Sequence, residues 1–416
     1  MILKTIPVLI VIGLLIILPS LALAAAELST LPPDLSYECR QINNHLIHIL
    51  SIDPKKYRLR LVKAHSSVFG RETVSVTALR TGAIAAINAG FFEIGNGEDG
   101  RPSGTLVIDG EPLSLARREQ DLLLLHDKKL QILSGRLKIT LSTERQFIRP
   151  DTVNRLVTSD RDVVLYNHLW AHSTLTPYER QEVLIDQSGT VLEVVEHGDN
   201  PIPKLGWVLS FPQAKSLALL KPGQKLKFNF QLNSSKNKLK NLWDPEVSIV
   251  AGIPALLESG KLSAHLVSIA KNGYFAQAHA RSAIGVKENG NIVMVLAEHH
   301  YTQEFGKITL KEAQSVIQRK NLSKEEYAVL TLPTLISTLQ NEFSKQSGVV
   351  GLTLVELANL MLDLKCTQAI NLDGGGSSSL FLNGQVVNAA FGDQDEALGQ
   401  LTLRPVSNSL VVLKRD

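Results

Sequence analysis

Cysteine is scarce in this chain, with only Cys39 and Cys366 among 416 residues. No C-x-x-C pair exists, which excludes zinc sites built on paired cysteines. Two cysteines this far apart do not form the framework of a disulfide-rich fold. A thiol is commonly a small buried apolar group. A bridge between the two cysteines and two separate thiols both stay open as interpretations.

Aromatic residues are also scarce, and the net charge is small. Phe, Tyr and Trp make up 5% of the sequence, so few flat rings are present for sugars to stack on. The formal net charge is +3, and it becomes +2 if a leader carrying Lys4 is removed. The longest basic block is Lys236-Asn237-Lys238-Leu239-Lys240, which is too short to follow a nucleic-acid backbone. We therefore expect no nucleic-acid partner.

The first 24 residues have the pattern of a secretory signal peptide. Lys4 is followed by an apolar run from Ile6 to Leu18 and by small residues at Ala22 to Ala26. The sequence therefore predicts a secreted or periplasmic protein. An uncleaved leader is the alternative and the only predicted link to a membrane. Residues 25–35, which include Pro32-Pro33, are interpreted as a linker.

The remainder alternates between strand and turn patterns. Strands are predicted at His45 to Ile52 and at Tyr57 to Lys63, where apolar and polar residues alternate. Turn dipeptides indicate β-hairpins at three places: Asp109-Gly110, Ser134-Gly135 and Ser188-Gly189.

Helix signals are concentrated near the C-terminal third. Thr309 with Glu312 and Ser323 with Glu326 fit capping boxes, which predicts a helical insertion at about residues 305–347. A third box at Thr353 to Glu356 opens an amphipathic helix. We therefore predict an α+β fold, with mixed β-sheets and flanking helices, in a single large domain spanning residues 36–416.

The strongest functional motif follows directly on this helix. A predicted strand from Cys366 to Leu372 leads into Asp373 and then into three glycines and three serines, Gly374-Gly375-Gly376-Ser377-Ser378-Ser379. Consecutive glycines are costly to order, and they suit places where backbone approaches a ligand or presents N–H groups to an anion. No Lys follows the glycines and no G-x-S-x-G is present, which argues against a P-loop NTPase and an α/β-hydrolase.

Other segments could contribute to the same site. Asn88-Ala89-Gly90-Phe91-Phe92 also follows a short apolar run, and Arg281 could clamp a phosphate with its planar guanidinium. Gly95 to Gly100 matches G-x-G-x-x-G by letter but continues as a loop, so dinucleotide binding is not expected.

Metal chemistry has weak support. A structural Ca²⁺ held by Asn96, Glu98 and Asp99 stays an alternative. Neighbouring residues on a strand point to opposite faces, so Glu298-His299-His300 do not all reach one metal ion. No metal ligand and no cofactor is assigned.

Taken in order, these motifs resemble the phosphodiester glycosidase family. The resemblance spans roughly residues 36 to 414 and rests on six segments. They are Asn88 to Phe92, Ala251 to Leu256, Arg281 to Gly285, Gly351 to Ala358, Asn371 to Ser378, and Arg404 to Asn408. The run Asn371-Leu372-Asp373-Gly374-Gly375-Gly376-Ser377-Ser378 is the most specific of them.

The resemblance implies an exported hydrolase that cleaves a glycosyl-1-phosphodiester, with an N-acetylglucosamine-like sugar on a surface polysaccharide or glycoconjugate. Asp373 and Arg281 are the expected catalytic residues, with Glu93 or Glu298 as a second carboxylate. The expected substrate-binding residues are Asn88, Gly90, Phe91, Gly374, Gly375, Gly376, Ser377, Ser378, Arg404 and Asn408. A non-catalytic module that binds glycans or anionic polymers is the alternative.

Overall fold

The computed structural model describes residues 31–298 and 351–415, apart from 33, 43–44, 127–128, 214–219, 235–237, 272, 390–392 and 396–399. The structure is 47% strand and 11% helical, with three α-helices in the part of the chain that it describes. The prediction of an α+β fold with flanking helices is therefore wrong, and the protein is β-rich. The insertion predicted at about residues 305–347 lies outside the described residues. The described strands form four sheets of five or more strands.

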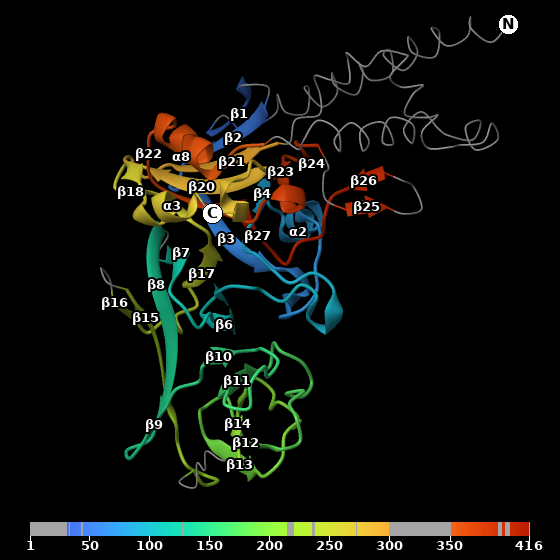
Figure 1. Ribbon diagram of the computed structural model, residues 1–416, viewed down its shortest axis with the longest axis vertical. Helices are drawn as coiled ribbons and strands as arrows, with labels where there is room; N and C mark the ends of the chain where they lie inside the picture. Colours follow the sequence, from blue (N-terminus) through green and yellow to red (C-terminus); the bar gives the residue numbers. More distant parts are fainter. Residues whose placement is uncertain are drawn as a thin grey trace, which may run out of the picture.

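Two antiparallel sheets form the upper part of the molecule in Figure 1. The seven-stranded sheet contains, in spatial order, β1 (Leu35–Ile42), β2 (His45–Ile52), β21 (Ile292–Ala297), β20 (Arg281–Lys287), β22 (Cys366–Asn371), β18 (Ala255–Glu258) and β19 (Lys261–Leu262). The five-stranded sheet contains β24 (Gln385–Val386), β23 (Leu380–Leu382), β4 (Ala85–Asn88), β27 (Asn408–Lys414) and β3 (Tyr57–Lys63). The predicted strands His45–Ile52 and Tyr57–Lys63 are confirmed residue for residue.

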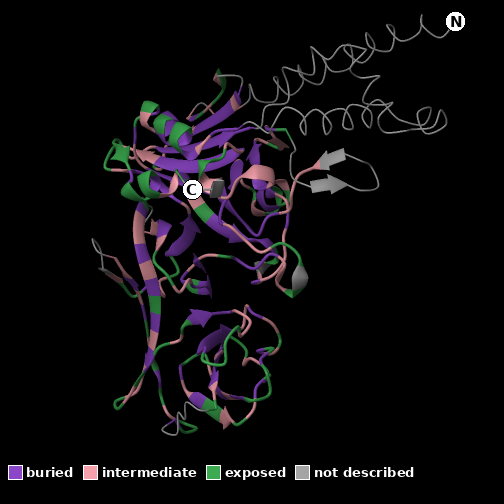
Figure 2. Ribbon diagram, viewed as in Figure 1, coloured by how far each residue is buried: buried purple, intermediate pink, exposed green. Residues whose placement is uncertain are grey.

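Side-chain alternation divides the seven-stranded sheet between two hydrophobic cores. On β21, Met294 and Leu296 join a core that also contains Ile87 and Leu410 of the five-stranded sheet. Val293 of the same strand joins a second core on the opposite face, with residues of a helix. Both faces are covered by apolar neighbours, which explains why the strand is apolar throughout. Figure 2 shows this part of the molecule as largely buried.

The three α-helices lie on the outer faces of these sheets (Figure 1). α8 (Leu354–Asp363) and the short α3 (Ala264–Ile269) cover the seven-stranded sheet, and α2 (Val74–Thr81) covers the five-stranded one. The capping box predicted at Thr353 is confirmed, because its hydroxyl accepts from Glu356 N while Glu356 Oε2 accepts from Thr353 N at 2.8 Å. Within the described ranges the structure also has four short 3₁₀ turns: η1 (Ala64–Ser66), η2 (Asn96–Glu98), η3 (Gly273–Ala276) and η4 (Gly375–Ser377).

An eight-stranded sheet extends downward from this body, and a five-stranded sheet packs against it (Figure 1). The larger sheet contains β16 (Lys238–Lys240), β15 (Lys227–Asn233), β8 (Lys129–Ser142), β7 (Gln120–His126), β17 (Ser248–Gly252), β5 (Leu106–Ile108) and β6 (Glu111–Ser114), with β9 (Phe147–Ile148) beside β8. The smaller contains β10 (Thr152–Val153), β11 (Val164–Asn167), β14 (Trp207–Pro212), β12 (Arg180–Ile185) and β13 (Val191–Val195). β25 (Asp393–Asp395) and β26 (Gln400–Thr402) form a separate pair.

The predicted turn dipeptides have different outcomes. Asp109-Gly110 joins β5 to β6, and Ser188-Gly189 lies between β12 and β13, so both predictions are confirmed. The turn at Ser134-Gly135 is wrong, because both residues lie inside β8. A Cβ on Gly135 would meet the carbonyl oxygen of Asn233 at 2.9 Å, so this glycine permits the close approach of β15.

None of the helices in the described ranges is long and apolar enough to cross a membrane.

Candidate functional site

The glycine loop lies where the ends of the two upper sheets meet. β22 of the seven-stranded sheet ends at Asn371, and β4 of the five-stranded sheet ends at Asn88. The backbone N–H of Asp373 donates to Ala89 O at 2.8 Å, and that of Leu372 donates to Ser282 O at 2.9 Å. The loop is therefore hydrogen-bonded to both sheets, which brings segments almost 300 residues apart in sequence into contact.

Asn88 holds the beginning of this loop from beneath. Its Nδ2 donates to the Asp373 carbonyl at 2.6 Å, and its Oδ1 accepts from the Ser282 hydroxyl at 2.7 Å and from Ser379 N at 3.2 Å. The side chain is fully buried. The structure therefore places Asn88 as a support for the loop, with its amide occupied by protein groups.

Asp373 combines partial burial with few hydrogen bonds to its carboxylate. Oδ1 accepts from Gly374 N at 2.9 Å, and Ser377 also hydrogen-bonds to the side chain. Burial raises the pKa of Asp373 to about 6, although the two hydrogen bonds and the positive charge of Arg404 lower it. A carboxyl group with a pKa near neutrality can both accept and release a proton, as general acid–base catalysis requires.

Most backbone N–H groups after Asp373 donate to other groups of the protein. The N–H of Gly375 donates to Ala280 O at 2.8 Å, and that of Ser377 donates to Gly374 O at 3.2 Å. Ser378 N donates to Gly375 O at 3.1 Å. The prediction that this loop presents a series of N–H groups to an anion therefore has little support in the geometry. Ser378 itself is buried.

The structure explains why two of the three positions in this loop are glycine. Gly375 has φ +59°, in the left-handed region that disfavours other residues. A Cβ on Gly376 would lie 2.7 Å from Cζ of Arg404, so the guanidinium rests directly on the Gly376 backbone. The loop thus holds a cation from the segment before β27 beside the Asp373 carboxyl group.

Arg281 begins β20 next to the loop, but its guanidinium is turned toward backbone carbonyls. Nε donates to Leu352 O at 3.0 Å, and Nη2 donates to Gln277 O at 2.7 Å. The side chain is 4% exposed. These two hydrogen bonds connect β20 to the segment that precedes it and to the segment that precedes α8. Of the two predicted cations, Arg404 is the one whose charge lowers the pKa of Asp373.

A pocket of about 160 Å³ is lined by three further predicted residues, but neither the loop from Asp373 to Ser379 nor Arg404 lines it. Gly90, Phe91 and Asn408 line it, and Asn408 Oδ1 accepts from Gly90 N at 2.7 Å. Sequence reasoning missed its remaining lining residues, which are Pro102 to Leu106, Gln120 and Val250 to Ile253. Ala251-Gly252-Ile253 was recognised only as part of the family resemblance, and Gln120 carries no motif.

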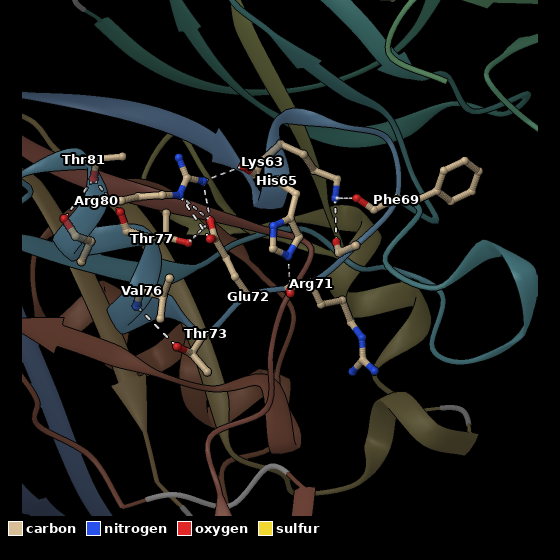
Figure 3. Close-up of polar contacts among 12 residues, drawn as sticks. Lys63, His65, Phe69, Arg71, Glu72, Thr73, Val76, Thr77, Arg80 and Thr81 are labelled. Carbon is tan, nitrogen blue, oxygen red and sulfur yellow. Dashed lines mark hydrogen bonds and ion pairs between the residues drawn. The ribbon is translucent and has the colours of Figure 1, made fainter. Parts of the chain in front are cut away.

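Figure 3 shows a partly buried polar network around α2. The segment that contains Arg404 and Asn408 is hydrogen-bonded to this network. Val406 forms an antiparallel bridge with Glu72, whose carboxylate accepts from Arg80 and Thr77. Lys63 pairs with Asn408 across β3 and β27, and its Nζ donates to Gly70 O at 2.9 Å. Burial lowers the pKa of Lys63 to about 7, despite the opposing carboxylates.

The carboxylates considered for Ca²⁺ face arginines. Glu98 Oε1 lies 2.7 Å from Arg101 Nε, and Asp99 Oδ2 accepts from Arg71 Nε at 2.8 Å. Among the described residues, no group of three or more His, Cys, Asp or Glu side chains is arranged to hold a metal ion.

The two candidates for a second carboxylate, Glu93 and Glu298, also contact other side chains. Glu93 accepts from the Ser103 hydroxyl at 3.0 Å and lies 3.4 Å from Arg101 Nη2. Glu298 contacts His48 at 2.5 Å. His299 and His300 lie outside the described residues.

Known proteins are similar to this chain in sequence and in fold. A family model described as phosphodiester glycosidase matches residues 181–324 and 336–413. A Rickettsia conorii protein of uncharacterised function is 38% identical over 289 residues, which cover 68% of this chain and 99% of the relative.

Two crystal structures have similar folds. A hypothetical protein from Synechocystis has a TM-score of 0.65 at 21% identity, with coverage of 92% of this chain and 62% of the Synechocystis chain. A Burkholderia pseudomallei protein described as "putative exported protein" has a TM-score of 0.62 at 22% identity, with coverage of 89% and 74%. The family model matches more than half of the chain, and the Rickettsia relative aligns with 68% of it. The chain belongs to the phosphodiester glycosidase family.

Proposed function

We propose that this protein is an exported hydrolase that cleaves glycosyl-1-phosphodiesters, releasing a free sugar and a phosphate monoester. The observation that carries the proposal is the position of the Arg404 guanidinium against Gly376 of the glycine loop, where its positive charge lowers the pKa of Asp373. Asp373 N also donates to Ala89 O, and the next residue, Gly90, lines the pocket. Family membership supports the reaction class. An N-acetylglucosamine-like sugar on a surface polysaccharide or glycoconjugate is the substrate that we expect.

In the proposed reaction Asp373 and Arg404 have different roles. Asp373, as a carboxylate above its pKa of about 6, accepts a proton from the attacking water. The water oxygen bonds to the anomeric carbon, and the bond from that carbon to the phosphate oxygen breaks. Arg404 then stabilises the charge that develops on the departing phosphate monoester, since a fixed cation costs no reorganisation during the reaction.

Export rests on separate support. The predicted leader precedes the described residues, and the Burkholderia structure carries the same expectation in its description. The expected location is secreted or periplasmic.

The direct test is release of free sugar from a panel of sugar-1-phosphodiesters by the purified protein, beginning with UDP-N-acetylglucosamine. We expect turnover on at least one substrate, and its loss in Asp373→Asn. Binding of the panel without any sugar release would instead support the non-catalytic glycan-binding alternative.

A further inference from the structure

A second cluster of reactive groups is formed by β1, β2 and the residue that follows β21. Cys39 on β1 is exposed and pairs directly with His48 on β2. Side chains of directly paired residues lie on the same face of a sheet, with Cβ atoms roughly 5 Å apart. Cys39 and His48 are therefore neighbours in the sheet, although they lie nine positions apart in sequence.

The imidazole of His48 is held at both nitrogens. Nε2 contacts Glu298 Oε1 at 2.5 Å, and Nδ1 contacts the Tyr37 hydroxyl at 2.8 Å. His48 is 3% exposed and Glu298 is 7% exposed, so this pair lies almost entirely out of solvent. Glu298 Oε1 also accepts from Ala389 N at 3.3 Å, which fixes the carboxylate in turn.

This arrangement contains the three parts of an activated nucleophile. A thiol is accessible, an imidazole lies beside it, and a buried carboxylate orients the far side of the imidazole. Burial lowers the pKa of His48, but hydrogen bonds to Cys39 and Glu298 outweigh it and raise the pKa to about 9. The imidazole can therefore keep a proton that it takes from the thiol.

We propose that Cys39 is a reactive thiol that undergoes exchange with small disulfides, with His48 as its proton acceptor and Glu298 as the residue that positions His48. In the reaction, the Cys39 proton passes to the His48 imidazole, and Sγ attacks one sulfur of the external disulfide. The sulfur–sulfur bond of that reagent breaks, and its second half leaves as a thiolate that recovers the proton. Cys39 ends as a mixed disulfide, so one disulfide is consumed and another is formed.

The chain supplies its own control thiol. Cys366 on β22 is 3% exposed, and burial raises its pKa to about 11. It should react only after unfolding. The folded protein therefore reports on Cys39 alone.

The experiment measures the rate at which the folded protein releases thionitrobenzoate from 5,5′-dithiobis(2-nitrobenzoate) at neutral pH. We expect one rapidly reacting thiol per chain and none in Cys39→Ser. His48→Gln should slow the reaction roughly tenfold or more, because the proton acceptor is lost. Glu298→Gln should slow it less, since the imidazole remains but is held less firmly.

A matched control places the thiol elsewhere on the same strand. Ser36 is exposed on β1 and pairs with Ser51, so the double variant Ser36→Cys, Cys39→Ser presents a thiol without an imidazole opposite. We expect this thiol to react about tenfold more slowly than Cys39. Equal rates for the two positions would overturn the proposal, as would an unchanged rate in folded His48→Gln. If His48→Gln fails to fold, the comparison of the two thiol positions decides alone.

Discussion

Replacing Asp373 with Asn is the most informative change at the proposed site. Asn has nearly the same size and keeps an oxygen that can accept from Gly374 N, so the hydrogen bond at 2.9 Å can be retained. What it removes is the charge and the proton exchange. The variant therefore separates a chemical role for Asp373 from a role in supporting the loop.

The expected effect on stability follows from the pKa of Asp373. Its folded-state pKa of about 6 lies above the ordinary value of 3.8, so the folded protein holds a proton that the unfolded chain releases between these values. The stability contributed by this proton is complete below about pH 3.8 and is lost as the pH rises through about 6. At pH 7.5 the carboxylate therefore costs at most about 3 kcal/mol, at 1.36 kcal/mol per pH unit. Asn does not ionise, so the variant should be more stable than the native protein at pH 7.5, and the difference should vanish toward pH 4.

The effect on activity should have the opposite sign. Loss of a general base typically lowers turnover by about 10²–10⁴-fold. In the native protein, kcat/KM should fall as the pH drops below about 6, because Asp373 becomes protonated. This acid limb should be absent from the residual activity of the variant. Sugar release and thermal unfolding should be measured from pH 4 to 8 on the same preparations.

Asp186→Asn provides the matched control. Asp186 is a carboxylate in a hairpin turn. Hydrogen bonds from the Ser188 hydroxyl, and from Ser188 N and Thr190 N at 2.8 Å, hold the pKa of Asp186 below its ordinary value. This variant should leave turnover unchanged and should not raise the melting temperature at pH 7.5. The reasoning is refuted if Asp373→Asn keeps near-native turnover. A fall in its melting temperature at pH 7.5 would show that Asp373 acts mainly as a support for the loop.

Three further predictions concern other parts of the chain. Gly376→Ala should displace the Arg404 guanidinium, which lies 2.7 Å from the new Cβ, and should raise KM roughly tenfold with little change in melting temperature; steady-state kinetics would show it. Gly252→Ala should lower the free energy of unfolding by about 1–3 kcal/mol, because the new Cβ would clash with the Asn371 carbonyl oxygen. The control Gly97→Ala, whose new Cβ would have no atom within 4 Å, should leave the free energy of unfolding unchanged in the same denaturant titration. The mature protein should begin near Ala25 or Glu27, and N-terminal sequencing of exported protein that still starts at Met1 would contradict this.

Local patterns were sufficient to predict several elements of this fold. The strand at Tyr57–Lys63, the hairpin at Ser188-Gly189 and the capped helix at Thr353 each depend on residues close together in sequence. Alternation, turn dipeptides and capping boxes report on such contacts directly. The same reasoning placed a turn at Ser134-Gly135, because a glycine needed for close packing has the same letter as one needed for a turn.

The site divides in the same way. Sequence alone proposed Asp373, the glycines and Arg404 as candidates, because the family motif contains them. It did not reveal that Asn88 and Arg281 spend their donors on backbone carbonyls, or that Gln120 lines the pocket. Nor did it indicate that Cys39, His48 and Glu298 form one cluster. These contacts join residues up to 285 positions apart, so only the register of the sheets decides which side chains meet and which remain available to a ligand.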